Sequence, residues 1–212
     1  MYNPCRAYVP VSTALKSLYE GRAYRLRMTR YEQRHRWLSL LLDCYALIDL
    51  SVWQAVDTAS DVLACREGCT ACCRHTIPLS TLEALGLRFY VHTLLDAALY
   101  QDLRRNISRQ GSLCCFNHQG SCTVYALRPI ACRRYLVTGT ACAEDESPLD
   151  SRPHAVLHPS RDVLRRAVAL TLPFYRTIGL KPESGEDVLS FYLRKNMPLT
   201  SLNERIFAGE SY

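Results

Sequence analysis

The sequence predicts a mainly α protein, in which a helical scaffold holds two irregular, cysteine-rich loops and strands are few or absent. Three observations lead to this prediction. Apolar residues recur at three- and four-residue steps in several long segments, as they do in amphipathic helices. The two-residue alternation that is typical of half-buried strands is scarce. Two segments, residues 65–78 and 107–160, have no helical period and are rich in Cys, Gly, Pro, Ser and Asp.

The first part of the chain contains two of the expected helices, over residues 11–20 and about 29–63. The second of these carries one apolar face, which is formed by Trp37, Leu40, Leu41, Cys44, Ile48 and Val52. Because Cys44 belongs to this face, we expect it to be a buried core residue and not a metal ligand.

Helix-start signals mark the remaining helices. Ser80 and Glu83 have the spacing of a capping box, so we expect a helix from there towards residue 106 and assign Glu83 to capping and not to catalysis. Ser160 begins another helical pattern, which should bend or stop near Pro173. A last short helix is expected over Glu186–Lys195.

The length of 212 residues suits one domain or one domain with appendages. We divide the chain into an N-terminal helical segment (1–60), a cysteine-cluster core (61–145) and a C-terminal helical segment (146–212) that packs on the core as one domain. A hydrophobic fraction of 48% and a charged fraction of 22% exclude the disordered and fibrous classes of protein.

Two features predict a cytoplasmic, reducing location. The first residues lack the basic and apolar regions of a signal peptide. The most apolar window, Trp37–Val56, is interrupted by Asp43 and Asp49, so we expect no membrane span and no membrane partner. In a reducing compartment, clustered cysteines are metal ligands or reactive thiols more often than disulfides.

Eight of the eleven cysteines lie between residues 65 and 132 and form two groups. The first group has the pattern C-x3-C-x2-C-C, and the second extends from the pair Cys114 and Cys115 to Cys132. Two residues between thiolates let a chain offer both sulfurs to one metal, and two such groups from distant segments can complete a site. The expected metal ligands are Cys65, Cys69, Cys72, Cys73, Cys114, Cys115, Cys122 and Cys132.

The order of these cysteines resembles that of the bacterial YkgJ-type cysteine-cluster family, a zinc- or iron-chelating domain family. The resemblance covers about residues 60–145 and includes a second half with the pattern C-x7-C-x9-C, which ends in Tyr-x-x-Arg-Pro-x-x-Cys-Arg. Flagellin lysine N-methylases carry a related cluster, and this relation implies an iron–sulfur cluster, [4Fe–4S], in preference to zinc. Cys115 stands where the family has proline, which leaves open whether Cys114 or Cys115 is the ligand. Cys142 could match a further family cysteine.

Either kind of centre, four thiolates on zinc or on a [4Fe–4S] cluster, carries a net charge of about −2. Four arginines beside the ligand positions could balance this charge by donating to the sulfurs, namely Arg74, Arg128, Arg133 and Arg134. His75 and His118 could each replace a cysteine as a ligand. Eight thiols exceed one four-ligand site, so either two metals bind or one cluster binds beside a redox pair.

The function expected from these residues is metal binding, with a redox role or a role in support of a modification reaction. The partner would be a protein or redox partner that the sequence does not identify. The sequence also does not decide whether the protein is an enzyme, because it contains no catalytic motif that we can defend.

Two alternatives remain. One is a zinc-stabilised, non-enzymatic module with a nucleic-acid- or protein-binding face at Arg22–Trp37, where six arginines are interleaved with aromatic residues. A solvated helix face explains that stretch more simply. The other is a protein lysine methylase-like enzyme that depends on S-adenosylmethionine. The spacing C-x3-C-x2-C also occurs in radical S-adenosylmethionine enzymes, but a short helical chain does not suit their barrel fold.

Overall fold

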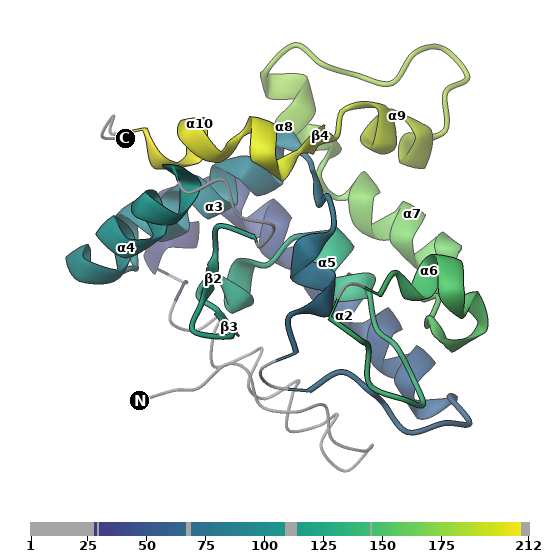
Figure 1. Cartoon of the computed structure of the whole chain (residues 1–212). Coiled ribbons are helices and arrows are strands. Elements are labelled where there is room, and N and C mark those ends of the chain that lie inside the picture. Colours follow the sequence, from purple (N-terminus) through teal and green to yellow (C-terminus); the bar gives the residue numbers. More distant parts are fainter. Residues whose placement is uncertain (1–27, 29, 67–68, 109–113, 145, 209–212) are drawn as a thin grey trace.

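The computed structural model describes residues 28, 30–66, 69–108, 114–144 and 146–208 and confirms a mainly α fold (Figure 1). The α-helices described are α2 (Arg36–Asp57), α3 (Thr81–Thr93), α4 (Ala97–Ser108), α5 (Ile130–Arg134), α6 (Pro148–Ser151), α7 (Arg161–Ala169), α8 (Leu172–Thr177), α9 (Val188–Arg194) and α10 (Asn203–Phe207). Short 3-10 turns are η2 (Ala71–Arg74), η3 (Tyr125–Leu127), η4 (Pro153–Ala155) and η5 (Leu199–Ser201). The helix expected over residues 11–20 lies outside the described residues.

Strands are few, as expected. Strand β1 (Pro78–Leu79) pairs with β4 (Met197–Pro198), and β2 (Asn117–His118) pairs with β3 (Ser121–Cys122). Both pairs are antiparallel. The first joins the cysteine-rich core to the C-terminal part of the chain, and the second is a hairpin within the second cysteine segment.

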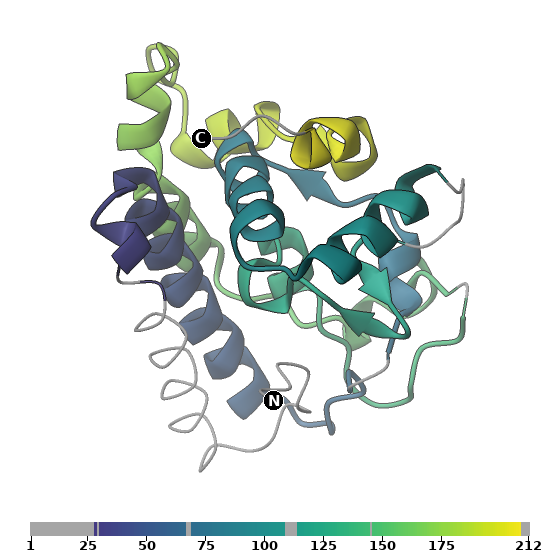
Figure 2. The same ribbon diagram turned by 90° about the vertical axis from the view of Figure 1, so that its left-hand side faces the viewer.

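Helix α2 is the long core helix, and it packs against α3, α5 and α7 (Figure 2). Its inward face includes Leu38, Leu41, Ile48 and the thiol of Cys44, all of them buried. The prediction that Cys44 is a core residue is therefore confirmed. By length and composition alone this helix could cross a membrane, but three helices cover its apolar face, as they do around the core helix of a globular domain.

The helix expected over residues 29–63 is interrupted before α2 and ends at Asp57, earlier than predicted. The backbone leaves the helical conformation at His35, with φ −125° and ψ 87°, and α2 begins at the next residue. This turn brings the rings of Tyr31, His35 and Trp37 against Phe89 of α3, with ring centroids 5.1, 5.6 and 5.8 Å from that of Phe89. Residues 30–32 are helical as well, so the expected helix is interrupted at residues 33–35, where these aromatic rings pack on the neighbouring helix.

The helix expected from residue 80 towards 106 is divided in two. Helix α3 ends at Thr93, and α4 begins after Asp96, whose Oδ1 atom accepts a hydrogen bond from the Leu99 N–H at 2.8 Å. The change of direction lets α4 contact α10, where the Tyr100 hydroxyl donates to the Phe207 carbonyl oxygen at 2.9 Å. Helix α10 was not expected from the sequence.

The helix predicted from Ser160 is confirmed, and Ser160 Oγ accepts from the Val163 N–H at 3.4 Å. This helix ends at Ala169, before Pro173, which instead occupies the first turn of α8. Proline is tolerated there because the first N–H groups of a helix have no intrahelical partner. Helix α9 lies within the range expected for the last helix.

Glu83 is buried and connects three helices. Its own N–H donates to Ser80 Oγ at 3.3 Å, and its Oε2 atom accepts from the Ser80 N–H at 3.0 Å, which confirms the capping box. Oε2 also accepts from the Tyr192 hydroxyl of α9 at 2.8 Å, and Oε1 accepts from the Ile130 N–H at the start of α5 at 2.7 Å. One carboxylate thus fixes the positions of α5 and α9 relative to α3.

Arg133 of α5 attaches the second cysteine segment to α2. Its guanidinium forms an ion pair with Asp49 at 2.6 Å, lies 4.0 Å from the centre of the Tyr45 ring, and donates to the carbonyl oxygens of Ala126 and Arg128. The Arg133 side chain is buried. A buried charge needs such partners, because it has lost its contact with water.

A small ladder of backbone hydrogen bonds holds the first cysteine segment against residues 136–139. The Ala64 N–H donates to the Val137 carbonyl oxygen, and the Gly139 N–H donates to the Val62 carbonyl oxygen, each at 2.8 Å. On its other side, residues 136–139 bond to residues 155–157. We call residues 62–65, 136–139 and 155–157 the ladder.

Replacing Glu83 with Leu leaves three buried donors without an acceptor. At about 1–3 kcal/mol for each unsatisfied donor, we predict a loss of at least about 3 kcal/mol in the free energy of unfolding, measured by urea denaturation. Tyr192→Phe, which removes one of the three donors, is the matched control and should cost about 1 kcal/mol. Equal losses in the two variants would contradict the connecting role of Glu83.

Candidate metal centre

The two cysteine segments meet at one backbone hydrogen bond. The Cys114 N–H donates to the Cys73 carbonyl oxygen at 2.8 Å, and so joins η2 to the segment that leads into the β2–β3 hairpin. The hairpin turn contains Gln119 and Gly120, both with positive φ (51° and 78°), as a tight two-residue turn requires. The turn returns the chain so that Cys122 lies opposite Asn117.

Four thiols gather around this hairpin, and we call them the hairpin group: Cys73, Cys114, Cys122 and Cys132. Burial and the nearby thiols of Cys114 and Cys73 raise the pKa of Cys122 to about 12. Burial and the thiols of Cys122, Cys114 and Cys73 raise the pKa of Cys132. Cys114, Cys122 and Cys132 also pack on the same apolar cluster, which contains Phe116 and Val124.

The remaining thiols, which we call the ladder group, are Cys65 of the ladder, Cys69 and Cys142, whose charges act on Cys65, and Cys72, on which the charge of Cys65 acts. The Val137 N–H donates to Cys65 Sγ at 3.4 Å. Burial raises the pKa of Cys65, and the nearby thiols of Cys69 and Cys142 add to this effect. Cys65 and Cys142 pack on one apolar cluster, which is formed by Val137, Ala155 and Val156.

Cys72 and Cys73 connect the two groups because they are neighbours in sequence. The Cys72 thiol donates to the Cys73 sulfur, which raises the pKa of Cys72 and lowers that of Cys73 to about 7. A hydrogen bond with the Asn117 side chain contributes to the low pKa of Cys73. The charges of the Cys132 and Cys65 thiols also raise the pKa of Cys72, so its sulfur lies near both groups.

Cys114 and Cys115, between which the sequence does not decide, have different surroundings. Cys115 is buried, and its thiol donates to Asn203 Oδ1 of α10 at 3.2 Å. The Cys114 thiol forms a side-chain hydrogen bond with Cys115. The charge of Cys114 raises the pKa values of Cys122 and Cys132. The structure therefore brings seven of the eight expected ligands into the two groups, and it places Cys115 against α10.

Two of the four neighbouring arginines form ion pairs with acidic side chains from other segments: Arg74 pairs with Glu144, and Arg133 pairs with Asp49. Among the described contacts, none joins Arg134 to a sulfur. Arg128 does act on the thiols: it stacks 4.2 Å from the centre of the Tyr125 ring, and its charge lowers the pKa values of Cys65, Cys122 and Cys132.

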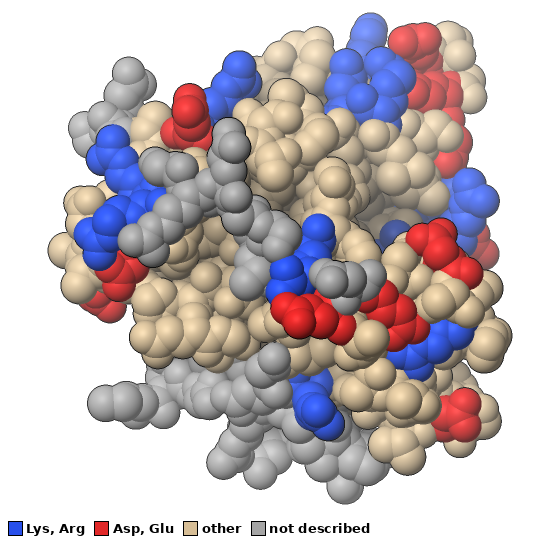
Figure 3. Space-filling model, viewed as in Figure 1, with Lys and Arg blue, Asp and Glu red and all other residues tan. Residues whose placement is uncertain are grey.

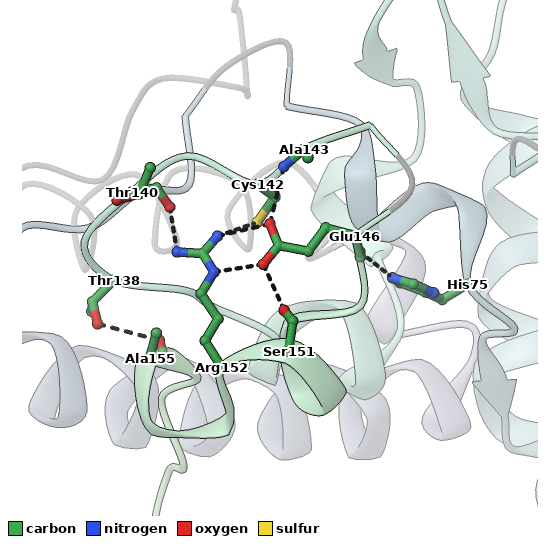
Figure 4. Close-up of polar contacts among 9 residues, drawn as sticks. All are labelled: His75, Thr138, Thr140, Cys142, Ala143, Glu146, Ser151, Arg152 and Ala155. Atoms are coloured by element: carbon green, nitrogen blue, oxygen red, sulfur yellow. Dashed lines mark hydrogen bonds and ion pairs between the residues drawn. The ribbon is translucent and has the colours of Figure 1, made fainter.

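Arg152 is the residue at this site that sequence reasoning missed. Figure 4 shows its guanidinium enclosed by the loop of residues 139–152. It donates to Cys142 Sγ at 3.6 Å, to the Thr140 carbonyl oxygen at 2.6 Å and to both carboxylate oxygens of Glu146. Its position in the sequence, ten residues after Cys142 and next to Pro153, gives no signal of these contacts.

The Glu146 carboxylate accepts from Arg152, from the Ser151 hydroxyl at 2.7 Å and from the Ala143 N–H at 3.0 Å. These donors lower the pKa of Glu146 to about 2. The Glu146 carbonyl oxygen lies within hydrogen-bond distance of His75 Nε2, at 3.2 Å.

Among the described residues, no three or more Cys, His, Asp or Glu side chains converge in an arrangement that could hold a metal ion. The thiols lie near enough to affect one another's protonation, but they do not point at a common centre. As a donor set they fit a thiophilic metal, because each group consists of sulfur ligands alone. Metal binding would require some thiols to turn towards each other.

Comparisons with protein-family models, with curated proteins and with solved structures found no match to this chain.

In the metal-free protein, we predict that Cys73 reacts with iodoacetamide faster than Cys72 near pH 7, because the thiolate is the nucleophile. Cys72→Ala removes the donor to Cys73 and should raise the pKa of Cys73 and slow its alkylation. Residue-specific rates can be followed by mass spectrometry as a function of pH. An unchanged Cys73 profile in the variant would contradict this role of Cys72.

The low pKa of Glu146 predicts an effect on acid stability. The pKa is lowered from 4.5 to about 2, so the stabilisation is complete above pH 4.5 and is lost as the pH falls towards 2. Glu146→Gln should flatten the dependence of unfolding on pH in that window. Glu144→Gln is the control, since Glu144 belongs to the same loop but its side chain is 75% exposed. The same change in both variants would refute the prediction.

Proposed function

We propose that this protein binds a metal cofactor through its clustered cysteines, with an iron–sulfur cluster as the preferred occupant and a redox role, or a role in support of a modification reaction. The observation that carries the proposal is the hydrogen bond between Cys114 and Cys73, since it brings thiols from two distant segments of the chain together. The thiols of Cys122 and Cys132 lie near those of Cys73 and Cys114.

The protonation of these thiols supports metal binding. In the hairpin group, three of the four pKa values are raised by burial and by neighbouring sulfurs, so at neutral pH those thiols carry their protons. A thiophilic cation reverses this balance, because it stabilises several thiolates at once. Without a cation, the proximity of these thiols gives no comparable stabilisation of their thiolate forms.

Arg128 supports a centre of net negative charge. Its guanidinium favours the thiolate forms of cysteines in both groups, which four-thiolate centres of charge about −2 require. A [4Fe–4S] cluster held here would supply one-electron transfer. The chain's own part would be to hold the thiolates, to partly exclude water from them through Phe116 and Val124, and to set the local charge through Arg128.

The preference for iron follows the resemblance of the cysteine order to the YkgJ-type family and to the methylase cluster. Four thiolates suit zinc equally well, so a zinc-stabilised binding module is the alternative. Its nucleic-acid face would be Arg22–Trp37, of which residues 22–27 and 29 lie outside the described residues. On the face in Figure 3, Lys and Arg lie in separate groups, most of them beside Asp or Glu, and they do not form a continuous basic stripe.

The proposal predicts that anaerobically purified, untagged protein contains iron and sulfide and absorbs broadly in the visible range until dithionite is added. Iron and zinc per chain can be measured by plasma mass spectrometry. About four irons for each filled centre is the expected result. Zinc without iron would make the metal structural, and protein that holds neither metal after reconstitution would overturn the proposal.

The double variant Cys72→Ser and Cys132→Ser removes one thiol from each group and should abolish metal binding. Cys44→Ala is the matched control, because Cys44 is buried on the core face of α2 and should leave the metal content unchanged. Circular dichroism confirms that each variant is folded. Full metal content in the double variant would show that these residues are not the ligands.

A further inference from the structure

We infer that Cys73 and Cys114 form a reversible disulfide in the metal-free protein, which cross-links the two cysteine segments and withdraws both thiols from metal binding. Both residues are half-buried free cysteines in the structure. The cross-link itself requires only the backbone and side-chain geometry of this pair. Its consequence, control of metal loading, rests on the proposed function.

The backbone places the two residues within disulfide distance. The Cys114 N–H donates to the Cys73 carbonyl oxygen at 2.8 Å. Because a Cα atom lies about 2.4 Å from its own carbonyl oxygen and about 1.5 Å from its own nitrogen, this hydrogen bond limits the separation of the two Cα atoms to about 6.7 Å. Disulfides usually join Cα atoms about 4.4–6.8 Å apart, and a pair beyond about 7 Å cannot be bridged unless the backbone moves.

This pair differs from the other pairs of cysteines in the region. In the part of the chain that the structure describes, no other backbone hydrogen bond joins two cysteines. The consecutive residues Cys72 and Cys73 have Cα atoms about 3.8 Å apart, and so do Cys114 and Cys115. That separation is below the usual range, so a disulfide within either consecutive pair would be strained.

A side-chain contact brings the Cys73 sulfur to the turn that begins at Cys114. Asn117 closes this turn, since its N–H donates to the Cys114 carbonyl oxygen at 2.9 Å. The side chain of the same Asn117 forms a hydrogen bond with the Cys73 thiol, so the Cys73 sulfur lies beside the turn. To meet, the two thiols have to leave their present partners, Cys72 and Cys115, and rotation about χ1 provides this movement.

The oxidant would be a small organic disulfide, such as oxidised glutathione. One of the two cysteines, as a thiolate, attacks a sulfur of this molecule, whose S–S bond breaks, and the first glutathione leaves as a thiolate and takes up a proton. The other cysteine then loses its proton and attacks the protein sulfur of the mixed disulfide, which releases the second glutathione. Two protein thiols are thereby oxidised, and the small disulfide is reduced to two thiols.

The cross-link and a bound metal exclude each other. The thiolate is the form of cysteine that binds a metal, and the sulfurs of a disulfide are no longer thiolates. Cross-linking thus removes two thiols of the hairpin group and leaves Cys122 and Cys132. Conversely, thiolates that a metal holds are not free to attack a disulfide. We therefore expect oxidation to block metal loading, and metal to block oxidation.

The test exposes reduced, metal-free wild-type protein to graded ratios of oxidised to reduced glutathione without air, and then blocks the free thiols with N-ethylmaleimide. Trypsin and chymotrypsin together separate Cys114 from Cys122, because Phe116 lies between them. Mass spectrometry should show the peptide of Cys73 joined to the peptide of Cys114, at a mass lower by two hydrogen atoms than the sum of the two peptides. Dithiothreitol should separate them.

Single variants assign the cross-link to its two residues. Cys73→Ser and Cys114→Ser should each lose it, whereas the neighbouring variants Cys72→Ser and Cys115→Ser are the matched controls and should retain it. Wild-type protein that forms no link between the two peptides at any ratio would overturn the inference. So would a wild-type link that fragment ions place at Cys72 or Cys115, a readout that requires no variant to fold.

Zn²⁺ uptake separates this inference from the proposed function. The Zn²⁺ bound per chain, measured against a chromogenic chelator, should be lower in the cross-linked protein than in the reduced protein, and dithiothreitol should restore it. Equal Zn²⁺ binding by the two forms would overturn the control of metal loading. Reduced protein that holds neither zinc nor iron would overturn the proposed function, while a mapped cross-link between Cys73 and Cys114 would still support the disulfide.

Discussion

The buried carboxylate of Glu83 accepts hydrogen bonds from three places in the chain, and the geometry of the cysteine region depends on it. One donor is the capping N–H at the start of α3, one is the hydroxyl of Tyr192, and one is the N–H of Ile130, with which α5 begins. Because Cys132 lies two residues after Ile130, the same carboxylate that starts α3 also sets the position of a candidate ligand. A group used for helix capping thus also positions the site.

The remaining thiols are positioned by short irregular segments attached to this helical frame. Arg133 ties α5 and η3 to α2, the Cys73–Cys114 hydrogen bond ties η2 to the hairpin, and the ladder holds Cys65 against residues 136–139. Each attachment uses backbone groups or a charged side chain with defined partners, while Cys114, Cys122 and Cys132 also pack on the apolar cluster that contains Phe116 and Val124.

Local signals in the sequence identified the features that depend on neighbours within a few residues. The spacing of Ser80 and Glu83 predicted a capping box, Ser160 predicted a helix start, and the position of Cys44 in an apolar period predicted burial. The helix breaks at His35 and near Asp96 were missed, because they depend on Phe89 and on α10, which are distant in sequence. The partners of Arg133 and Arg152 were missed for the same reason, and so was the position of Cys142 beside Cys65 and Cys69. The pattern of cysteines predicts a metal site, but only the folded chain shows how the thiols are grouped.

X-ray absorption spectroscopy at the metal edge of the loaded protein tests most directly whether sulfur ligands hold the metal. The arrangement described above predicts a first shell of sulfur alone, with about four sulfurs for each metal at about 2.3 Å. For iron, a metal–metal distance within the cluster should accompany this shell. A first shell dominated by nitrogen or oxygen, or one with two sulfurs or fewer, would contradict a centre built from these cysteines.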